Sequence, residues 1–143
     1  MHDCPPDRVN IKFVNSVPVH FIEALYKEAG WWDDSWGRNP EFLSRIVKDS
    51  AVFAGAFCGE KLVGMGRALS DLASDAYIQD VVVLKEYRKK GIGKEIVLAL
   101  VRALKEKGVD WIGLVAEPGT ASFYRDMGFE VLDTHVPMKY RGK

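Results

Sequence analysis

The sequence predicts a mixed α/β fold in which about four helices pack on a mostly antiparallel sheet. Short β-rich runs and helical patterns follow one another as strand, two helices, three strands, helix, strand, helix and two strands. A glycine turn joins two of the β runs directly, as in a hairpin. The chain has 143 residues, of which 48% are apolar and 28% charged, as in one globular domain. We therefore expect residues 1–143 to form a single domain whose sheet is not of the doubly wound parallel kind.

A short strand and two helices open the chain. Residues 9–14 are the first β-rich run. Pro18 suits the first turn of a helix because its φ is already fixed near the helical value. An apolar stripe of period i, i+1, i+4 follows until Gly30, which is a typical helix C-cap. A second, short helix is expected to begin at Asn39 and Pro40.

Three strands come next. Residues 51–58 are short and apolar, a tight turn lies at residues 59–61, and a second run covers residues 62–69. These two runs are expected to form an antiparallel hairpin. After a polar connection at residues 70–74, residues 77–84 form a third strand, which we expect to be antiparallel to the second.

The second half begins with the clearest helix of the sequence. Residues 91–107 have one wide apolar face and end at Gly108. A buried strand at residues 110–116 and a short helix at residues 120–127 follow. Two last strands are expected at residues 129–132 and 136–140.

Charge and composition exclude several classes of protein. Lys and Arg number 20, as do Asp and Glu, so the formal net charge is zero and the global positive field of a non-specific nucleic-acid binder is missing. No apolar stretch approaches the roughly 20 residues of a membrane span, and no apolar leader is visible. We therefore expect a cytoplasmic protein without nucleic-acid or membrane partners. The two cysteines, Cys4 and Cys58, are expected to be free thiols in a reducing compartment, and no metal site is predicted.

A glycine loop between the third strand and the long helix is the most informative segment. It reads Arg88-Lys89-Lys90-Gly91-Ile92-Gly93. Free N–H groups and the positive end of the helix dipole favour a phosphate at such a helix start, and glycines let the backbone approach a ligand. Neither the P-loop nor the dinucleotide-binding pattern is present. The simpler alternative is a strand-to-helix turn with solvated lysines.

A second string follows downstream, Phe123-Tyr124-Arg125-Asp126-Met127-Gly128-Phe129. The pattern R-x-x-G-x-G before a long helix, followed by F-Y-x-x-x-G-F, resembles the GNAT superfamily of acyl-CoA-dependent N-acetyltransferases. The segments 66–71 and 76–83 also resemble its small arylalkylamine or serotonin-type branch. The resemblance covers residues 9–140 and implies a GNAT-like sheet in which two parallel strands splay apart.

The resemblance implies a site for acetyl-CoA. The strand before the loop would splay from its neighbour at residues 111–116 and would offer its backbone to the pantetheine arm. The loop amides would hold the diphosphate, and either Ser122 or Thr120 would replace an asparagine that many relatives carry before the last helix. The cofactor-binding residues implied in this way are Val81, Val82, Val83, Arg88, Lys89, Lys90, Gly91, Ile92, Gly93, Lys94 and Ser122.

Two residues are implied as catalytic. Tyr124 matches the tyrosine that protonates the leaving coenzyme A thiolate, and a phenol of pKa near 10 can do so at neutral pH. Deprotonating an alkylammonium at pH 7 costs about 4 kcal/mol, so a base near the acceptor helps. Gln79 cannot ionise, but Asp80 is adjacent to it and Glu117 ends the next expected strand. Of these two carboxylates, Asp80 is our choice for the base. Strand alternation places Gln79 and Asp80 on opposite faces unless the strand bulges.

The acceptor pocket is expected around the first two helices and the connection at residues 70–75. Trp31 and Trp32, with Trp36 nearby, would give an aromatic wall, and Glu117 and several aspartates would supply negative charge for a cationic amine. The alternative is that the tryptophans are core residues and the aspartates cap turns. We expect direct acetyl transfer from acetyl-CoA to a primary amine, most simply a small one. A homodimer is a further expectation. A protein lysine or N-terminal acetyltransferase and a non-catalytic acyl-CoA-binding module remain the alternatives.

Overall fold

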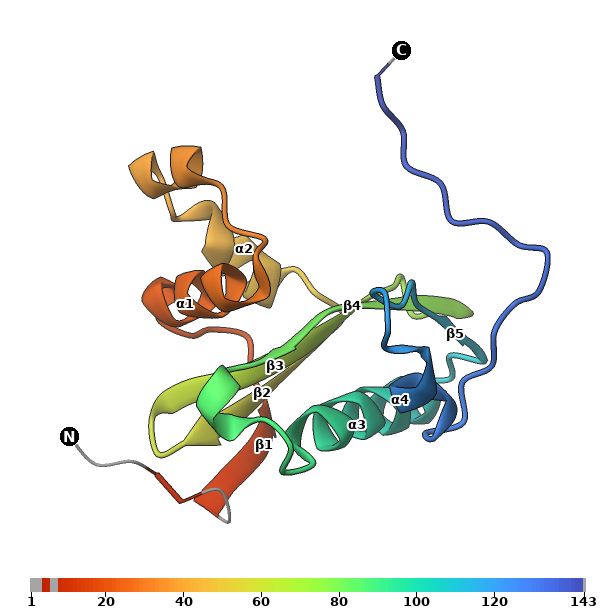
Figure 1. Cartoon of the computed structure of the whole chain (residues 1–143), viewed down its shortest axis with the longest axis horizontal. Coiled ribbons are helices and arrows are strands. Elements are labelled where there is room, and N and C mark those ends of the chain that lie inside the picture. The colour runs from red at the N-terminus through yellow and green to blue at the C-terminus, as the bar shows by residue number, and fades with distance from the viewer. Residues whose placement is uncertain (1–3, 6–7, 143) are drawn as a thin grey trace. The chain divides into compact units, whose positions relative to one another are not determined.

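The computed structural model describes residues 4–5 and 8–142 and divides the chain into two compact units, Met1–Gly113 and Leu114–Lys143. Figure 1 shows the elements. Those of the first unit are β1 (Val9–Phe13), α1 (Val19–Ala29), the 3-10 helix η2 (Asp34–Arg38), α2 (Phe42–Lys48), β2 (Val52–Cys58), β3 (Lys61–Leu69), β4 (Asp75–Val83), the 3-10 helix η3 (Lys85–Tyr87), α3 (Ile92–Glu106) and β5 (Trp111–Gly113). The second unit contains α4 (Ala121–Arg125). The single domain expected for residues 1–143 stays a prediction.

The sheet of the first unit follows the chain in the order β1-β2-β3-β4-β5. The pairs β1–β2, β2–β3 and β3–β4 are antiparallel, and the pair β4–β5 is parallel. The β2–β3 hairpin turns at Gly59, whose φ of 62° is easy only for glycine. The mixed, mostly antiparallel sheet with one parallel pair is therefore confirmed.

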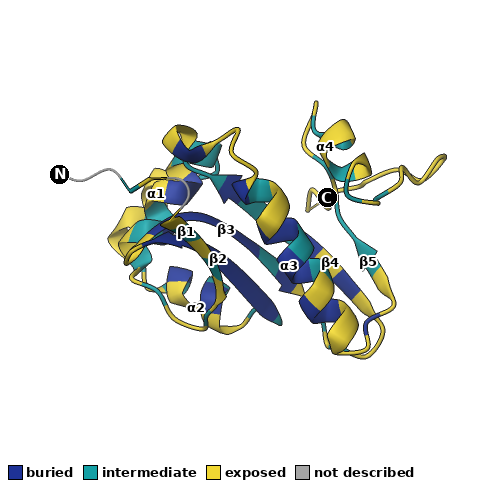
Figure 2. Ribbon diagram, turned by 90° about the horizontal axis from the view of Figure 1, so that it is seen from below, coloured by how far each residue is buried: buried dark blue, intermediate teal, exposed yellow. Residues whose placement is uncertain are grey.

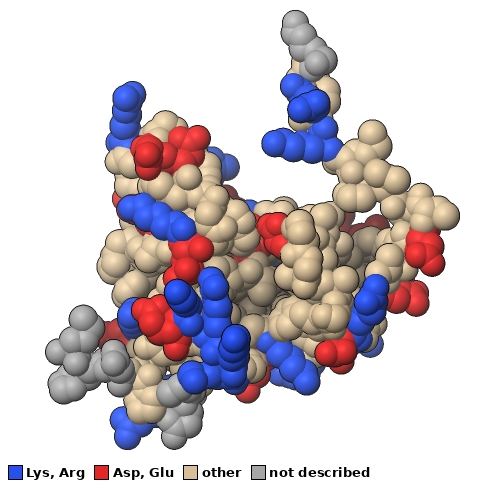
Figure 3. All heavy atoms as spheres, viewed as in Figure 1, with Lys and Arg blue, Asp and Glu red and all other residues tan. Residues whose placement is uncertain are grey.

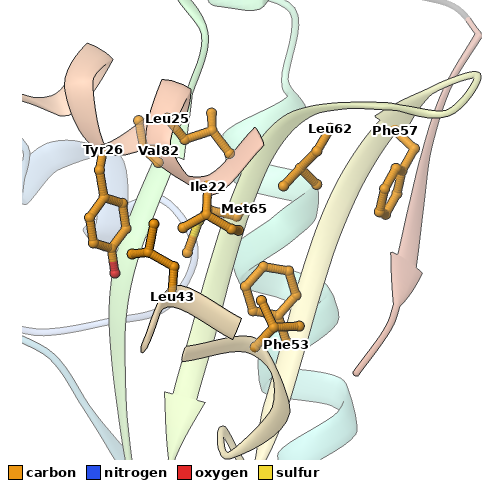
Figure 4. Close-up of a cluster of buried hydrophobic side chains, with 10 residues drawn as sticks. Ile22, Leu25, Tyr26, Leu43, Phe53, Phe57, Leu62, Met65 and Val82 are labelled. Carbon is orange, nitrogen blue, oxygen red and sulfur yellow. The ribbon is translucent and has the colours of Figure 1, made fainter. Parts of the chain in front are cut away.

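Helices cover both faces of this sheet (Figures 1 and 2). On one face, α1 and α2 pack on the central strands through a cluster of buried side chains, part of which Figure 4 shows. Its members are Ile22, Leu25, Tyr26, Leu43, Val47, Phe53, Phe57, Leu62, Met65 and Val82. On the other face, α3 packs its apolar side on β2, β3 and β4. No helix in the described ranges is long and apolar enough to cross a bilayer.

The third strand lets α3 approach closely because it carries glycines on the face toward that helix. A Cβ at Gly64 would lie 3.2 Å from Ile96 Cδ1, and one at Gly66 would lie 2.8 Å from Ile96 Cγ2. Both Ile96 and Leu100 are fully buried there. The two glycines of β3 thus set how closely α3 packs on the sheet.

The last three predicted strands were wrong in part or in whole. The strand expected at 110–116 covers only Trp111–Gly113, and no strand forms at 129–132 or 136–140 among the described residues of the second unit. Val136 is 74% and Met138 91% exposed. Alternating apolar residues form a strand only when a neighbouring strand pairs with their backbone. The alternation itself does not show whether such a neighbour exists.

The expectation of two free thiols was also wrong. Cys4 and Cys58 form a disulfide, with Cα atoms 5.7 Å apart. Cys58 is buried at the end of β2, as its apolar run predicted. The pairing depends on the N-terminal segment returning to that strand end across 54 residues of sequence, which spacing alone does not reveal.

The close approach of α3 predicts the effect of one methyl group. Gly66→Ala should lower the stability by about 1–3 kcal/mol, because the new Cβ overlaps Ile96 and lies 3.1 Å from Leu100 Cδ1. Urea unfolding measures this as a lower midpoint at an unchanged slope. Gly37→Ala is the matched control, since a Cβ there meets nothing within 4 Å. Equal midpoints for the two variants would contradict a packing limit at Gly66.

Candidate active site

The fourth strand has an open edge where the two parallel strands diverge. β5 pairs only with Asp75, Ala76 and Tyr77, and no strand in the described chain covers this edge over residues 78–83. On the opposite edge, Val82 and Val83 stay paired with β3. In the predicted pantetheine segment, Val81–Val83, the last two residues are therefore paired on one side and open on the other, and Val81 lies at the register shift without a β3 partner. Its role in binding acetyl-CoA stays a prediction.

The glycine loop presents a row of unused amides. Lys89 and Gly91 both have left-handed backbones, with φ of 63° and 82°. In the described part of the chain, no backbone carbonyl accepts a hydrogen bond from the amides of residues 89–94. A Cβ at Gly91 would meet nothing within 4 Å, so the loop is open at this point. Successive free amides at the start of a 15-residue helix form a concave site suited to an anion.

The loop is fixed to α1 by a residue that the sequence reasoning missed, Glu28. Its Oε1 accepts the Lys85 amide at 3.2 Å, and its Oε2 lies 3.5 Å from Arg88 Nη2. Arg88 Nε also donates to the Val83 carbonyl at 3.0 Å. The Arg88 side chain thus braces the loop. No motif marks Glu28, because its contacts join segments 57 residues apart in the chain.

The lysines of the loop are on the surface. Lys85, Lys89, Lys90 and Lys94 are all exposed. Figure 3 shows Lys and Arg side chains gathered over the lower part of the molecule, with Asp and Glu among them. The neutral chain therefore has a local positive region around the loop amides, where it would attract a polyanionic ligand.

Asp80 lies at a β-bulge and is held by two side chains that the sequence did not indicate. The register between β3 and β4 shifts here, and Asp80 has a φ of 59°. Its Oδ2 accepts from Arg67 Nε at 2.7 Å and from the Tyr26 hydroxyl at 2.5 Å. The proposed base is thus a hydrogen-bonded, ion-paired carboxylate. Burial and this neighbouring carboxylate raise the pKa of Tyr26, so Tyr26 is a phenol donor at neutral pH.

The tryptophans expected in the acceptor pocket form an aromatic cluster around Tyr26. Trp31 packs edge-on against Tyr26 at 5.4 Å between ring centroids, and Trp32 packs edge-on against Trp36 at the same distance. All three tryptophans are partly buried and pack against the core cluster. They therefore serve in packing, and the faces that remain exposed are the part available to a substrate.

The nearby aspartates bind their own turns. Asp33 accepts from the Ser35 amide at 2.9 Å, and Asp71 accepts from the Ala73 amide at 2.9 Å. Ser74 donates to Asp75 at 2.7 Å. Asp33 and Asp71 thus cap turns, whereas Asp75 begins β4 and its carboxylate bonds to the adjacent serine.

Tyr124 and Glu117 belong to the second unit. Tyr124 lies on α4, with its ring edge-on to Phe123 and Phe129 at 4.9 and 5.7 Å. Burial raises the pKa of Tyr124, and the Glu117 carboxylate raises it further. Tyr124 is therefore protonated at neutral pH, as a general acid must be.

The last predicted cofactor contact also lies in this unit. The Thr120 hydroxyl donates to the Glu117 carbonyl at 2.7 Å and so closes its own turn. Ser122 is exposed and leaves its hydroxyl for a ligand. The first unit thus brings together the loop, the open edge of β4 and Asp80, while Tyr124, Glu117 and Ser122 belong to the second unit.

A hollow of about 510 Å³ lies elsewhere in the first unit. It is lined by Phe13, Val14, Asn15, Ser16, Val47, Lys48, Ser50, Ala51, Val52 and Phe53. No predicted site residue of the described chain lines it. The described residues also contain no group of three His, Cys, Asp or Glu side chains that could hold a metal ion.

Comparisons with known proteins agree with this architecture. A GNAT-family acetyltransferase from Streptococcus pneumoniae TIGR4 superposes with a TM-score of 0.76 at 26% identity, covering 94% of this chain and 99% of that one. A chloroplastic GCN5-related N-acetyltransferase of Arabidopsis thaliana is 46% identical over 71 residues, 50% of this chain and 28% of its own.

Two further relatives carry names with different acceptors. A histone acetyltransferase of Glycine max is 33% identical over 126 residues, 80% of this chain and 52% of its own. A chloroplastic serotonin N-acetyltransferase of Oryza sativa subsp. japonica is 34% identical over 96 residues, 64% of this chain and 48% of its own. The chain thus spans about a quarter to a half of the length of the three relatives described here.

The model of the acetyltransferase (GNAT) family matches residues 18–129, which include strands β2 to β5, the glycine loop and α4. The match contains both strings on which the resemblance rested, and it extends over more than half of the chain. This protein belongs to the acetyltransferase (GNAT) family.

Proposed function

We propose that this protein is an acetyl-CoA-dependent N-acetyltransferase that transfers the acetyl group directly to a primary amine. The unused amides of residues 89–94 carry the proposal, because they offer a diphosphate a concave row of donors at a helix start. The open edge of β4 supports it, since it offers backbone groups to an extended ligand arm beside that loop. Membership of the family adds the expectation of this chemistry.

Starting from an ammonium, the nitrogen loses two protons and the sulfur gains one. Asp80 accepts the ammonium's hydrogen bond and assists the loss of the first proton. The neutral amine nitrogen then attacks the thioester carbonyl carbon, the C–S bond breaks, and the sulfur leaves with the bonding pair and takes the phenol proton of Tyr124. The nitrogen loses its second proton as the amide forms. One of the two protons restores the Tyr124 phenol through solvent and the other is released to solvent, so atoms and charges balance.

The acceptor is the part of the proposal with two versions. A small amine suits the partly exposed faces of Trp31, Trp32 and Trp36. The relative named for serotonin favours this version, and the relative named for histone favours a protein lysine. Cytoplasmic location and homodimerisation also stay predictions, and the disulfide between Cys4 and Cys58 removes the free-thiol argument for a reducing compartment.

Calorimetric titration with acetyl-CoA tests the proposal first. We expect micromolar binding, and weaker binding of 3′-dephospho-coenzyme A if the exposed lysines contact the 3′-phosphate. Thiol release is then followed with a panel of small amines and, in parallel, a histone-tail peptide. Binding without thiol release from any acceptor would favour a non-catalytic acyl-CoA-binding module. Absence of binding at millimolar ligand would contradict the whole proposal.

A pair of glycine variants at the two ends of α3 isolates the loop. Gly91 and Gly108 both have positive φ, 82° and 93°, and a Cβ at either meets nothing within 4 Å. Alanine at each position should therefore cost a similar ~1 kcal/mol of stability. Only Gly91→Ala should weaken acetyl-CoA binding, by about tenfold or more, because it alters the amide row. Equal affinities of the two variants for acetyl-CoA would remove the loop from the binding site.

Replacement of the proposed acid separates binding from turnover. Tyr124→Phe should leave the affinity for acetyl-CoA nearly unchanged and lower kcat by about 10²-fold or more, because only the proton donor is lost. Since the pKa of Tyr124 is raised, wild-type activity should persist as the pH rises from 7 to 9 instead of falling through tyrosine ionisation. Tyr140→Phe, at an 87% exposed tyrosine of the same unit, is the control. Unchanged kcat in Tyr124→Phe would show that another group protonates the thiolate.

A further inference from the structure

The bulge in β4 brings two consecutive residues to one face of the sheet. Met65 pairs with Val82 and Arg67 with Gln79, so a single residue of β3, Gly66, faces two residues of β4. Asp80 is the extra residue, and its left-handed φ of 59° is uncommon for a residue with a side chain. Gln79 lies opposite Arg67, and Asp80 bonds to Arg67, so both face the side covered by α1. In a regular strand Gln79 and Asp80 would lie on opposite faces, and the bulge is the reason that they share one.

One oxygen of Asp80 takes both of the donors that reach it. Tyr26 from α1 and Arg67 from β3 both donate to Oδ2. The ion pair is largely buried, with 14% of the Arg67 side chain and 19% of the Asp80 side chain exposed. Arg67 also reaches Ser50, with Nη1 3.4 Å from its hydroxyl oxygen. Such donors hold the orientation of the carboxylate.

The second oxygen of Asp80 is different. Among residues 4–5 and 8–142, no hydrogen bond or ion pair uses Oδ1. No side-chain oxygen in those ranges is both fully buried and without a partner, so Oδ1 is accessible. It lies in the half of β4 that β5 does not cover, beside the aromatic cluster of Trp31 and Trp36 around Tyr26. An acceptor amine could reach this oxygen without displacing either donor.

We propose that Tyr26 and Arg67 are positioning residues, which fix Asp80 through Oδ2 so that Oδ1 receives the acceptor amine. The inference rests on the proposed function, in which Asp80 serves that amine. Arg67 balances the negative charge of Asp80, and Tyr26 supplies a neutral donor. They are the titratable groups that contact Asp80 from the elements packed on it in the first unit. Both act through Asp80 and neither contacts the reacting atoms.

A double-mutant cycle in kcat/KM tests this assignment. With one amine substrate, Asp80→Asn should lower kcat/KM by about 10²-fold and Tyr26→Phe by about tenfold. The double variant should be no slower than Asp80→Asn, within about twofold, because Tyr26 acts only through the carboxylate. A tyrosine that merely supports the fold would give multiplied losses, and that result would overturn the proposal.

Tyr87→Phe is the matched control for Tyr26→Phe in the same assay, because Tyr87 is also buried and its hydroxyl makes no hydrogen bond to the described residues. Tyr87→Phe should leave kcat/KM nearly unchanged. Equal losses of kcat/KM in Tyr87→Phe and Tyr26→Phe would overturn the role of Tyr26.

Arg67 is tested by graded replacement. Arg67→Lys should keep part of the activity that Arg67→Ala loses, because a lysine retains the charge but not the guanidinium contacts to both Asp80 and Ser50. Equal kcat/KM in the two folded variants would overturn the role of Arg67. If wild type is active but Asp80→Asn is equally active, the inference fails while acetyl transfer stands. If wild type acetylates no amine or peptide, the proposed function fails and the inference falls with it.

Discussion

The pairing of β4 with β5 ends after three residue pairs, and this divergence is the constraint on which the proposed chemistry depends. A central strand normally uses both edges of its backbone for hydrogen bonds to its neighbours. Here β3 holds one edge, while the other is open from Ile78 onward in the described chain. A segment of unpaired backbone is tolerable when water or a ligand satisfies it. The same segment contains Asp80 and leads directly into the glycine loop.

Rigid packing on both faces keeps this open strand in place. On one side, α3 lies against Gly64 and Gly66, so the start of the helix that offers its amides is set by contact with the sheet. On the other side, Glu28 ties the loop to α1 through Lys85 and Arg88. The loop can therefore keep two left-handed residues without being a loose connection. Preorganised donors lose less entropy when they bind an anion.

The charges of the first unit are arranged by pairs. Asp80 is matched with Arg67 of the preceding strand, and Arg88 with Glu28 of the distant helix α1. The exposed lysines of the loop remain for solvent or ligand. A chain of zero net charge can in this way have a local positive region at the loop. It also has, at the bulge, a carboxylate of which only Oδ2 accepts hydrogen bonds. Net charge excluded a general nucleic-acid binder but could not locate either feature.

The sequence by itself determined the local elements and the loop. Periodicity, the hairpin glycine and the helix caps gave α1, α3 and the β2–β3 hairpin, because these features depend on residues close in the chain. The same is true of the glycine loop before α3 and of the family to which its motif points.

Only the tertiary structure decided the features that join distant segments. The bulge at Asp80, its two donors Tyr26 and Arg67, the brace of Glu28 and the disulfide of Cys4 and Cys58 all have partners whose spacing carries no pattern. The C-terminal strands failed for the same reason, since a strand exists only with its partner. Interactions within a helix or turn are encoded locally, whereas pairing across a sheet is chosen by the packing of the whole unit.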